Sequence, residues 1–252
     1  SVSLGRSQTR TRQALIVSQV ALSLLLLAVA GLFGRSLSAI FSADAGLDTE
    51  TLATFSINPF EQRYETERTR QLALELQRRL EMLPGVEAAS AASGNLLMGG
   101  GGENTISAQG YEPKSGENMQ AGANSVLPNF FATTGVPLLA GREFTQADVL
   151  GTPQVVIVNK TFAERFFGSP SEAIGRRVGY ALSDEFPFEV VGVTADHKAW
   201  NLREDDMPRT YWPLLQRENP DHLAFYFRAR GNPESMLAGA VSTVRDVDPE
   251  LG

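Results

Sequence analysis

Two histidines, His197 and His222, are the residues of this chain best suited to acid–base or metal chemistry. Such chemistry needs partners at defined spacing, and neither histidine has a second histidine three or four residues away. Asp196 directly precedes His197 at the end of a predicted strand. A lone Asp-His pair in this place is more typical of a solvent-exposed turn than of a catalytic pair, so we expect neither histidine to act in catalysis.

Loop segments that could bind ions lack the spacing that binding requires. The acidic clusters at 184–185 (Asp-Glu) and 204–206 (Glu-Asp-Asp) do not form the D-x-[DN]-x-[DN]-G pattern that gathers oxygens around calcium. The glycine run at 99–102 is not followed by Lys-Ser or Lys-Thr, as a phosphate-binding loop requires. We interpret the acids as solvated loop charge and the glycine run as a flexible loop, with contact to a partner as its alternative role.

Three aromatic residues, Trp200, Tyr211 and Trp212, could form a cage for a cationic ligand, but packing in a core or an interface is the expected role. The chain has no cysteine, which excludes disulfides, thiolate metal sites, iron–sulfur clusters and thiol nucleophiles. The sequence therefore predicts no catalytic, cofactor-binding or metal-binding residue, no cofactor, and a protein that is not itself an enzyme.

The elements that position these residues begin with an uncharged run of 22 residues between Arg12 and Arg35. As a helix this run would be about 33 Å long, which matches the hydrocarbon core of a bilayer. A signal peptide would have a shorter apolar part, and a buried core helix would rarely extend so far without a charge. We therefore predict a cytoplasmic segment over 1–12, a transmembrane helix over 13–34 and a stalk over 35–50.

Charge on the two sides of the span predicts its orientation. Three arginines and no acid precede it, whereas acids follow from Asp44 onward. Positive charge stays on the cytoplasmic side, so we expect the N-terminus in the cytoplasm and the main domain on the outer side of the membrane. The chain has 22 basic and 29 acidic residues; the first 35 hold four arginines and no acid, so the remainder has a net charge of −11. We expect no nucleic-acid binding by so acidic a domain.

Periodicity predicts both strands and helices after the stalk. Leucines at helical spacing over 63–83 and small apolar residues over 233–247 predict two amphipathic helices, and shorter helices are expected to open at Pro128 and to cover 160–167. The expected strands are 52–58, 86–93, 103–109, 119–127, 154–159, 188–195, 210–215 as an edge strand, and 222–230.

An internal repetition organises these elements. The strand and helix that follow the stalk are matched by the last strand and helix of the chain, and each unit ends in a turn that contains proline. Two such units make a split βαβ layer, with two helices on one sheet. The sequence therefore predicts an α+β fold with a two-part outer domain, in which a strand-rich segment, 96–219, is inserted between the halves of the layer.

Several short motifs follow one another over nearly all of the chain. The most specific is PNFFATTGVPLLAGREF at 128–144, with Asp148 after it. In order and spacing, these motifs resemble the periplasmic core domain of MacB-like ABC-transporter permeases, of the MacB/FtsX group, together with its first transmembrane helix. The other motifs are RQALIVSQVALSLLL (12–26), LEMLPGV (80–86), VVIVN (155–159), AERFF (163–167), IGRR (174–177), VVGV (190–193) and YWPLLQ (211–216).

The resemblance implies a porter-like subdomain at 51–95 and 220–252, a sabre-like inserted subdomain at 96–219, and no ATP chemistry in this domain. It implies a permease embedded in the bacterial inner membrane, with its main domain in the periplasm or outside the cell. Such a permease transmits ATP-driven motion, for export or mechanotransmission. The implied partners are a cytoplasmic ABC ATPase subunit, a second permease unit in a homo- or pseudo-dimer, and a periplasmic adaptor or envelope protein.

The sequence departs from the family pattern in two ways. It contains no Walker motif, and it holds one of the expected membrane helices, so we expect a fragment of a longer permease. The alternative is a single-span membrane sensor whose outer domain binds a ligand in a closed, polar-lined pocket.

Overall fold

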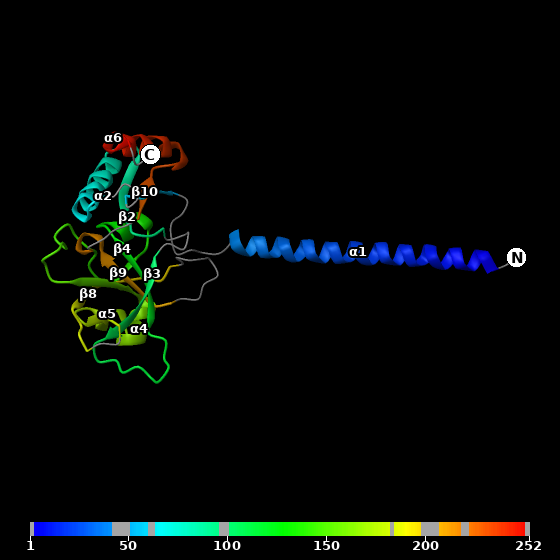
Figure 1. The fold of residues 1–252 in the computed structure, drawn as a ribbon, viewed down its shortest axis with the longest axis horizontal. Helices are drawn as coiled ribbons and strands as arrows, with labels where there is room; N and C mark the ends of the chain where they lie inside the picture. Colours follow the sequence, from blue (N-terminus) through cyan, green and yellow to red (C-terminus); the bar gives the residue numbers. More distant parts are fainter. Residues whose placement is uncertain are drawn as a thin grey trace. The chain divides into compact units, whose positions relative to one another are not determined.

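The computed structural model describes residues 3–41, 51–59, 64–95, 101–181, 184–197, 207–217 and 222–249 (Figure 1). The chain falls into two compact units, Ser1–Asp44 and Ala45–Gly252. Trp200, the acids at 204–206 and the first half of the glycine run lie outside the described residues.

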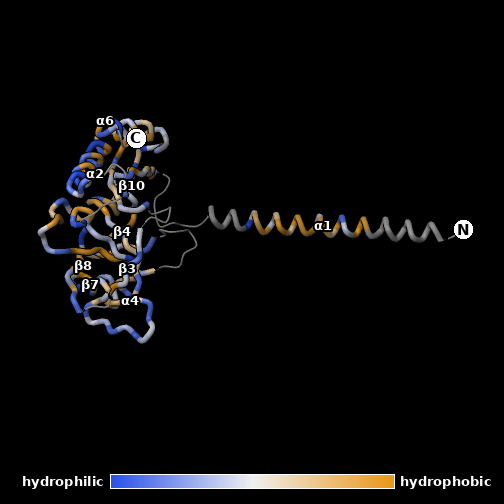
Figure 2. Tube along the Cα trace, in the orientation of Figure 1, coloured by the Kyte–Doolittle hydropathy of each residue, from blue (hydrophilic) through white to orange (hydrophobic). Residues whose placement is uncertain are grey.

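The first unit contains one long helix, α1 (Ser3–Phe41). By length and composition, its segment Leu15–Arg35 could cross a membrane, with a mean hydropathy of 2.4. Figure 2 shows this apolar band along the middle of the helix. Ser18 and Ser23 each donate to a helix carbonyl three or four residues earlier, both at 2.9 Å, so their hydroxyls need no other partner in lipid.

The second unit is a mixed α/β domain built on one sheet, whose described strands number ten. Its strands are β1 (Leu52–Ile57), β2 (Val86–Ala92), β3 (Gly102–Ala108), β4 (Gln120–Val126), β5 (Leu138–Gly141), β6 (Val155–Asn159), β7 (Arg177–Tyr180), β8 (Phe188–Thr194), β9 (Arg209–Pro213) and β10 (Leu223–Ala229). Its helices are α2 (Thr66–Glu81), α3 (Phe130–Thr134), α4 (Lys160–Phe167), α5 (Pro170–Ala173), the 3-10 turn η1 (Leu214–Gln216) and α6 (Glu234–Val247).

The strands β1, β10 and β2 form an antiparallel layer, in which each neighbouring pair shares six residue pairs. α2 and α6 cover one face of this layer and lie beside each other (Figure 1). Side chains alternate along a strand, so Phe225 and Phe227 of β10 join Leu76 of α2 and Val244 of α6 in one core. The first and last β-α units of the domain therefore share one sheet and one core.

The six strands β4, β3, β7, β8, β6 and β9 form a closed ring, because β9 pairs with both β6 and β4. All six contribute side chains to one core, which Phe162 and Phe166 of α4 complete. β5 pairs with β8 on the outside of this circuit. All six strands of the ring come from the strand-rich segment of the chain that lies between the two β-α units.

The layer meets the ring at a narrow junction. β2 and β4 share a single residue pair, against six pairs at each junction within the layer. The short helix α3 lies at this place: Phe130 packs edge-on against Tyr226 of β10 at 5.4 Å between ring centroids. Phe131 packs edge-on against Tyr211 of β9 at 5.0 Å. A shared aromatic core, more than strand pairing, therefore joins the layer to the ring.

The structure differs from the strand predictions in two places. The prediction of an edge strand over 210–215 is wrong, because β9 lies between β4 and β6. Pro213 is compatible with that position because it is the last residue of β9, where η1 begins and a missing N–H removes little pairing. β5 and β7 have no predicted counterpart, since four residues carry too little alternation to be recognised.

Candidate functional site

A groove of about 880 Å³ runs between α2 and the loop that follows β5. One wall is the face of α2 from Glu67 to Glu81, and the opposite wall is the segment 144–150. Buried Phe144 and Leu215 and half-buried Leu74 supply apolar lining. A hollow of this size lies in the range of about 300–1,000 Å³ that is usual for ligand sites in proteins.

The α2 wall carries charges of both signs that are already paired along the helix. Arg78 and Arg79 each donate to Glu75 at 2.6 Å, and these hydrogen bonds lower the pKa of the Glu75 carboxyl. Arg70 pairs with Glu67 at 2.8 Å. Exposed pairs three or four residues apart add little stability, so their main effect is to set the polarity of the wall.

Glu81, at the end of the same wall, has no ion pair among the described residues. Burial raises the pKa of its carboxyl, and hydrogen bonds from Gln77 and the Ala89 backbone act in the opposite direction. Gln77 is itself buried and donates to the carbonyls of Ala89 and Pro128, at 2.9 and 3.1 Å. Glu81 therefore adds an exposed carboxyl, without an ion pair in the described part of the chain, to this end of the wall.

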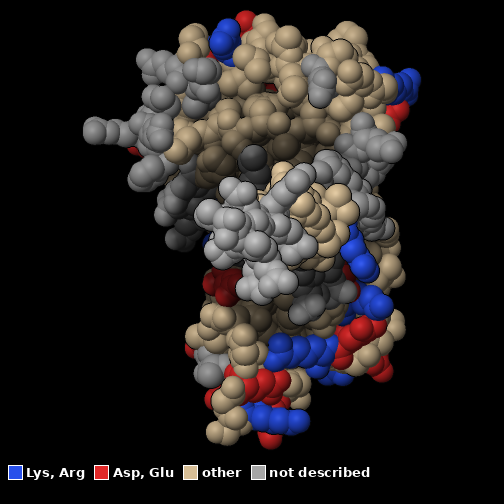
Figure 3. Space-filling model, turned by 90° about the vertical axis from the view of Figure 1, so that its right-hand side faces the viewer, with Lys and Arg blue, Asp and Glu red and all other residues tan. Residues whose placement is uncertain are grey.

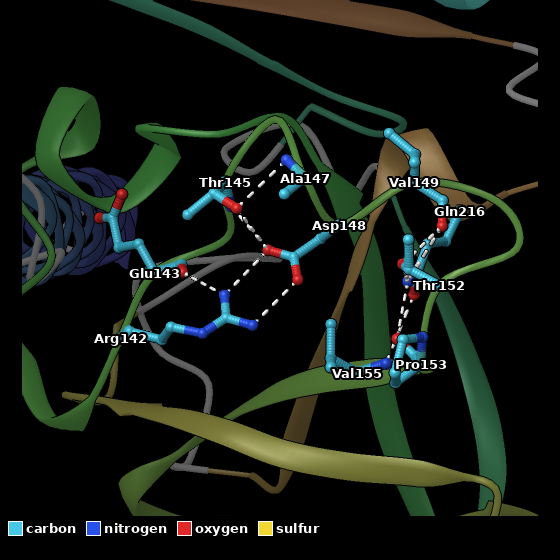
Figure 4. Close-up of polar contacts among 10 residues, drawn as sticks. All are labelled: Arg142, Glu143, Thr145, Ala147, Asp148, Val149, Thr152, Pro153, Val155 and Gln216. Atoms are coloured by element: carbon cyan, nitrogen blue, oxygen red, sulfur yellow. Dashed lines mark hydrogen bonds and ion pairs between the residues drawn. The ribbon is translucent and has the colours of Figure 1, made fainter.

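The opposite wall is shaped by a buried carboxylate, Asp148 (Figure 4). Arg142 donates to both carboxylate oxygens, at 2.8 and 2.9 Å, and Thr145 donates its backbone N–H at 2.7 Å and its hydroxyl at 3.1 Å. Burial alone would raise the pKa of Asp148, but these hydrogen bonds outweigh it and the pKa is lowered. The same ion pair raises the pKa of Arg142. The bidentate contact of Arg142 with Asp148 fixes the geometry of the loop.

Gln216 holds the far end of this loop (Figure 4). Its Nε2 donates to the carbonyl of Pro153 at 3.0 Å and to the hydroxyl of Thr152 at 3.1 Å. Its Oε1 accepts the backbone N–H of Val155 at 3.4 Å. Because Gln216 lies in η1, directly after β9, the loop is attached to the ring at both ends.

The α2 wall is attached to the same turn of chain. Arg70 donates through Nε and Nη2 to the backbone carbonyl of Arg217, at 3.1 and 3.0 Å. The side chain of Arg217 in turn donates to the hydroxyl of Tyr180 in β7 at 2.9 Å. Both walls are thus tied to the η1 region, which fixes the width of the groove. Its side chains offer apolar contact, hydrogen bonds and charge, which suit binding.

The sequence-predicted site residues lie apart from the groove. The prediction that His197 lies in an exposed turn is wrong: it is 4% exposed, and its Nε2 lies 2.6 Å from the hydroxyl of Tyr211. Asp196 accepts instead from the hydroxyl of Thr161 in α4, at 3.0 Å. Asp196 and His197 therefore bind different partners and do not form a pair with each other. Alternation along a strand cannot reveal this burial, because it depends on which strands come to lie against the strand end.

The aromatic residues take the packing role that the sequence predicts. Tyr211 and Trp212 are successive residues of β9 and enter two different cores. Trp212 packs against Tyr180 and Phe188, at 4.9 and 4.6 Å between ring centroids. Within the described part of the chain, no group of three or more His, Asp or Glu side chains could hold a metal ion.

The sequence does not identify the residues that shape the groove as a site, although Arg142 lies in its most specific motif and Asp148 follows that motif. One signal was present: Thr145 and Asp148 have the T-x-x-D spacing with which a hydroxyl and a carboxylate bind each other's local backbone. The spacing predicts a local turn, but it does not tell which helix lies across from it.

Charges elsewhere on the second unit are mixed in sign. On the face shown in Figure 3, Lys and Arg alternate with Asp and Glu toward the lower end, where Figure 1 places α4 and the β3–β4 connection. There Arg165 donates to Glu117 at 2.9 Å, and Tyr111 donates to the same carboxylate at 2.6 Å. The bonds from Tyr111, the Lys114 backbone and Arg165 lower the pKa of Glu117 to about 2. This cluster fastens the β3–β4 connection to α4.

Comparison with known proteins identifies the class. Residues 14–239 match the family described as the MacB-like periplasmic core domain, and the chain belongs to that family. Together with the apolar helix α1, this membership indicates a membrane protein of the ABC-transporter permease type with a periplasmic domain.

One curated relative is also a permease protein. Over 81 residues the chain is 32% identical to the probable syringafactin export ATP-binding/permease protein SyfD of Pseudomonas syringae pv. tomato (strain ATCC BAA-871 / DC3000). That match covers 32% of this chain and 12% of the relative, so the chain spans a small part of that protein's length.

Solved structures include the periplasmic region of MacB from Actinobacillus actinomycetemcomitans, with 17% identity, a TM-score of 0.50, and coverage of 80% of this chain and 86% of that one. This likeness shows a shared fold. The extracellular domain of the noncanonic ABC-type transporter YknZ from Gram-positive bacteria matches with 16% identity, a TM-score of 0.48, and coverage of 78% and 95%.

Proposed function

We propose that this chain is the first membrane helix and outer domain of an ABC-transporter permease, and that it transmits ATP-driven motion from a cytoplasmic ATPase to the periplasm. The observation that carries the proposal is the succession, in one chain, of an apolar helix and a MacB-like periplasmic core domain. In this proposal ATP hydrolysis belongs to a separate subunit or domain, and the chain is not itself an enzyme.

The proposed topology places 1–12 in the cytoplasm, 13–34 in the inner membrane and the stalk 35–50 on the periplasmic side. The arginines before the span and the acids after it support this orientation, since positive residues stay on the cytoplasmic side. Motion of the membrane helix would then reach the outer domain through the stalk and β1.

We further propose that the outer domain works as two subdomains, a porter-like one at 51–95 and 220–252 and a sabre-like one at 96–219. The single residue pair between β2 and β4 supports this division. The aromatic core around α3 supports mechanical coupling between the two parts, because packed cores resist deformation.

The groove between α2 and segment 144–150 is the proposed contact site for a periplasmic partner, and a second permease unit would complete the assembly. One wall of the groove belongs to the porter-like part and the other to the sabre-like part. A partner bound in the groove would therefore contact both parts and sense motion between them. The relative from Pseudomonas syringae is named for export, and export is the direction of transport proposed here.

The proposal is tested with the complete permease and its ATPase in proteoliposomes. Spin labels on cysteines at Leu32 in α1 and Ser115 in the β3–β4 connection, both exposed, report the distance between helix and outer domain. We expect ATP turnover to shift this distance, and an ATPase variant that cannot hydrolyse ATP to abolish the shift. A distance that does not change with ATP but changes with a small ligand would instead favour the alternative function, a single-span membrane sensor.

A further inference from the structure

Two residues near the start of the second unit, Thr51 and Leu52, are held by β10. Leu52 of β1 lies in register with Arg228, and the backbone N–H of Ala229 donates to the carbonyl of Thr51 at 2.8 Å. Thr51 is the first described residue after the segment 42–50 that follows α1. Motion that reaches Thr51 along the chain is therefore passed directly to this end of β10.

The side chain of Arg228 binds this starting point and α3 at the same time. Its Nη1 donates to the hydroxyl of Thr51 at 2.9 Å, and its Nε donates to the backbone carbonyl of Thr133 at 3.0 Å. Thr133 lies in α3 and is fully buried. A guanidinium carries several N–H donors in one rigid plane, so it can hold two acceptors at a fixed separation. One side chain thus spans the distance from the start of β1 to α3.

α3 continues this connection into the ring. Phe131 packs edge-on against Tyr211 of β9, while Phe130 packs against Tyr226 of β10. Glu143, which follows β5, accepts the backbone N–H of Ala132 at 2.8 Å and so attaches α3 to the segment after β5, a strand that pairs with β8 of the ring. The sheet offers a weaker route, because β2 and β4 share one residue pair.

We propose that Arg228 is a positioning residue that couples the start of the outer domain to α3, and through α3 to the ring, so that the ring follows the motion of the stalk. This inference rests on the proposed function. Charge-assisted hydrogen bonds suit the task because they are strong and fix the position of the acceptors.

The chain offers both a test variant and a matched control. Arg228→Met keeps an unbranched apolar stem that reaches about as far as Nε, and it removes the guanidinium donors. Thr51→Val removes one acceptor with little change of shape, and it avoids the core if Arg228→Met folds poorly. Arg230→Met is the control, because Arg230 lies just past the end of β10 and is 80% exposed in a surface pair with Glu87 at 2.8 Å.

The experiment uses the complete permease with its ATPase, and spin labels on cysteines at Ser56 and Ser115, which report the distance between β1 and the ring. We expect one narrow distance distribution, with and without ATP turnover, in the parent protein and in Arg230→Met. In Arg228→Met and Thr51→Val we expect the distribution to broaden only during turnover, with loss of transport and retention of ATP hydrolysis.

Two results would overturn the inference. One is an unchanged distribution with full transport in both Arg228→Met and Thr51→Val. The other is a distance distribution in Arg228→Met and Thr51→Val that is as broad without ATP as during turnover. That result would mean that Arg228 only stabilises the fold. Failure of the proposed function is seen separately, in the parent protein, as a distance from Leu32 to Ser115 that does not respond to ATP.

Discussion

At the scale of single residues, each conspicuous position of the motif at 128–144, and of Asp148 after it, has a structural role in the core, the backbone or the groove. Phe130 and Phe131 fill the core at the junction of layer and ring. Gly141 has a positive φ of 76°, and a Cβ there would clash with the carbonyl oxygen of Val191, so only glycine fits. Arg142 and Asp148 then fix the loop that follows.

The clamp on segment 144–150 leads to a prediction at this scale. Asp148→Asn keeps the size of the side chain and removes its charge, and we expect it to lower the free energy of unfolding by about 1–3 kcal/mol. Chemical unfolding measures this loss, and hydrogen exchange of residues 144–150 should rise. The exposed pair of Lys160 and Glu164, 3.6 Å apart, provides the control Glu164→Gln, for which we expect almost no change.

The pH dependence of the clamp follows from the direction of its pKa shift. The pKa of Asp148 is lowered in the folded protein, so its contribution is complete above the unfolded value near pH 4 and is lost as the pH falls through the folded value. The difference in stability between the parent protein and Asp148→Asn should therefore shrink on acidification below about pH 4. A difference that is constant from pH 7 to pH 2 would contradict the role of this carboxylate.

At the scale of elements, α2 and α6 are joined by the core that they share over β10, although more than 150 residues separate them in the chain. Leu76 is completely buried and Val244 is 3% exposed, and both belong to that core. Neither helix could bury its apolar face alone, since a helix of this length is marginal in water without packing.

Truncation in either helix should therefore destabilise the whole second unit. We expect Leu76→Ala to cost about 2–5 kcal/mol and Val244→Ala to cost less, because fewer carbon atoms leave the core. Thermal and chemical unfolding measure both losses, and the exposed Gln71→Ala on α2 is the control. Full stability of Val244→Ala would show that α6 does not take part in the cooperative unfolding of the domain.

At the scale of the whole molecule, charge is divided between the two ends of the chain. Its first 35 residues hold four arginines and no acid, and the remainder has a net charge of −11. This asymmetry supports a cytoplasmic N-terminus and an outer domain that stays off anionic lipid surfaces, because like charges repel.

The topology is tested with one introduced cysteine, since the chain has none of its own. Ser115→Cys, at an exposed position of the β3–β4 connection, should react with a membrane-impermeant thiol reagent added to intact cells whose outer membrane has been permeabilised. A cysteine at Ser7, before the span, should react only after lysis. The reverse pattern would place the outer domain in the cytoplasm.

The sequence by itself determined the apolar helix, most strands and the two amphipathic helices, because these depend on local periodicity. The motif at 128–144 also carried the family resemblance. Only the tertiary structure decided that β9 closes the ring, that His197 is buried, and that α2 lies across from segment 144–150 to form the groove. These features depend on contacts between residues far apart in the chain. Local patterns mark which face of an element is apolar, but they do not specify which other element covers it.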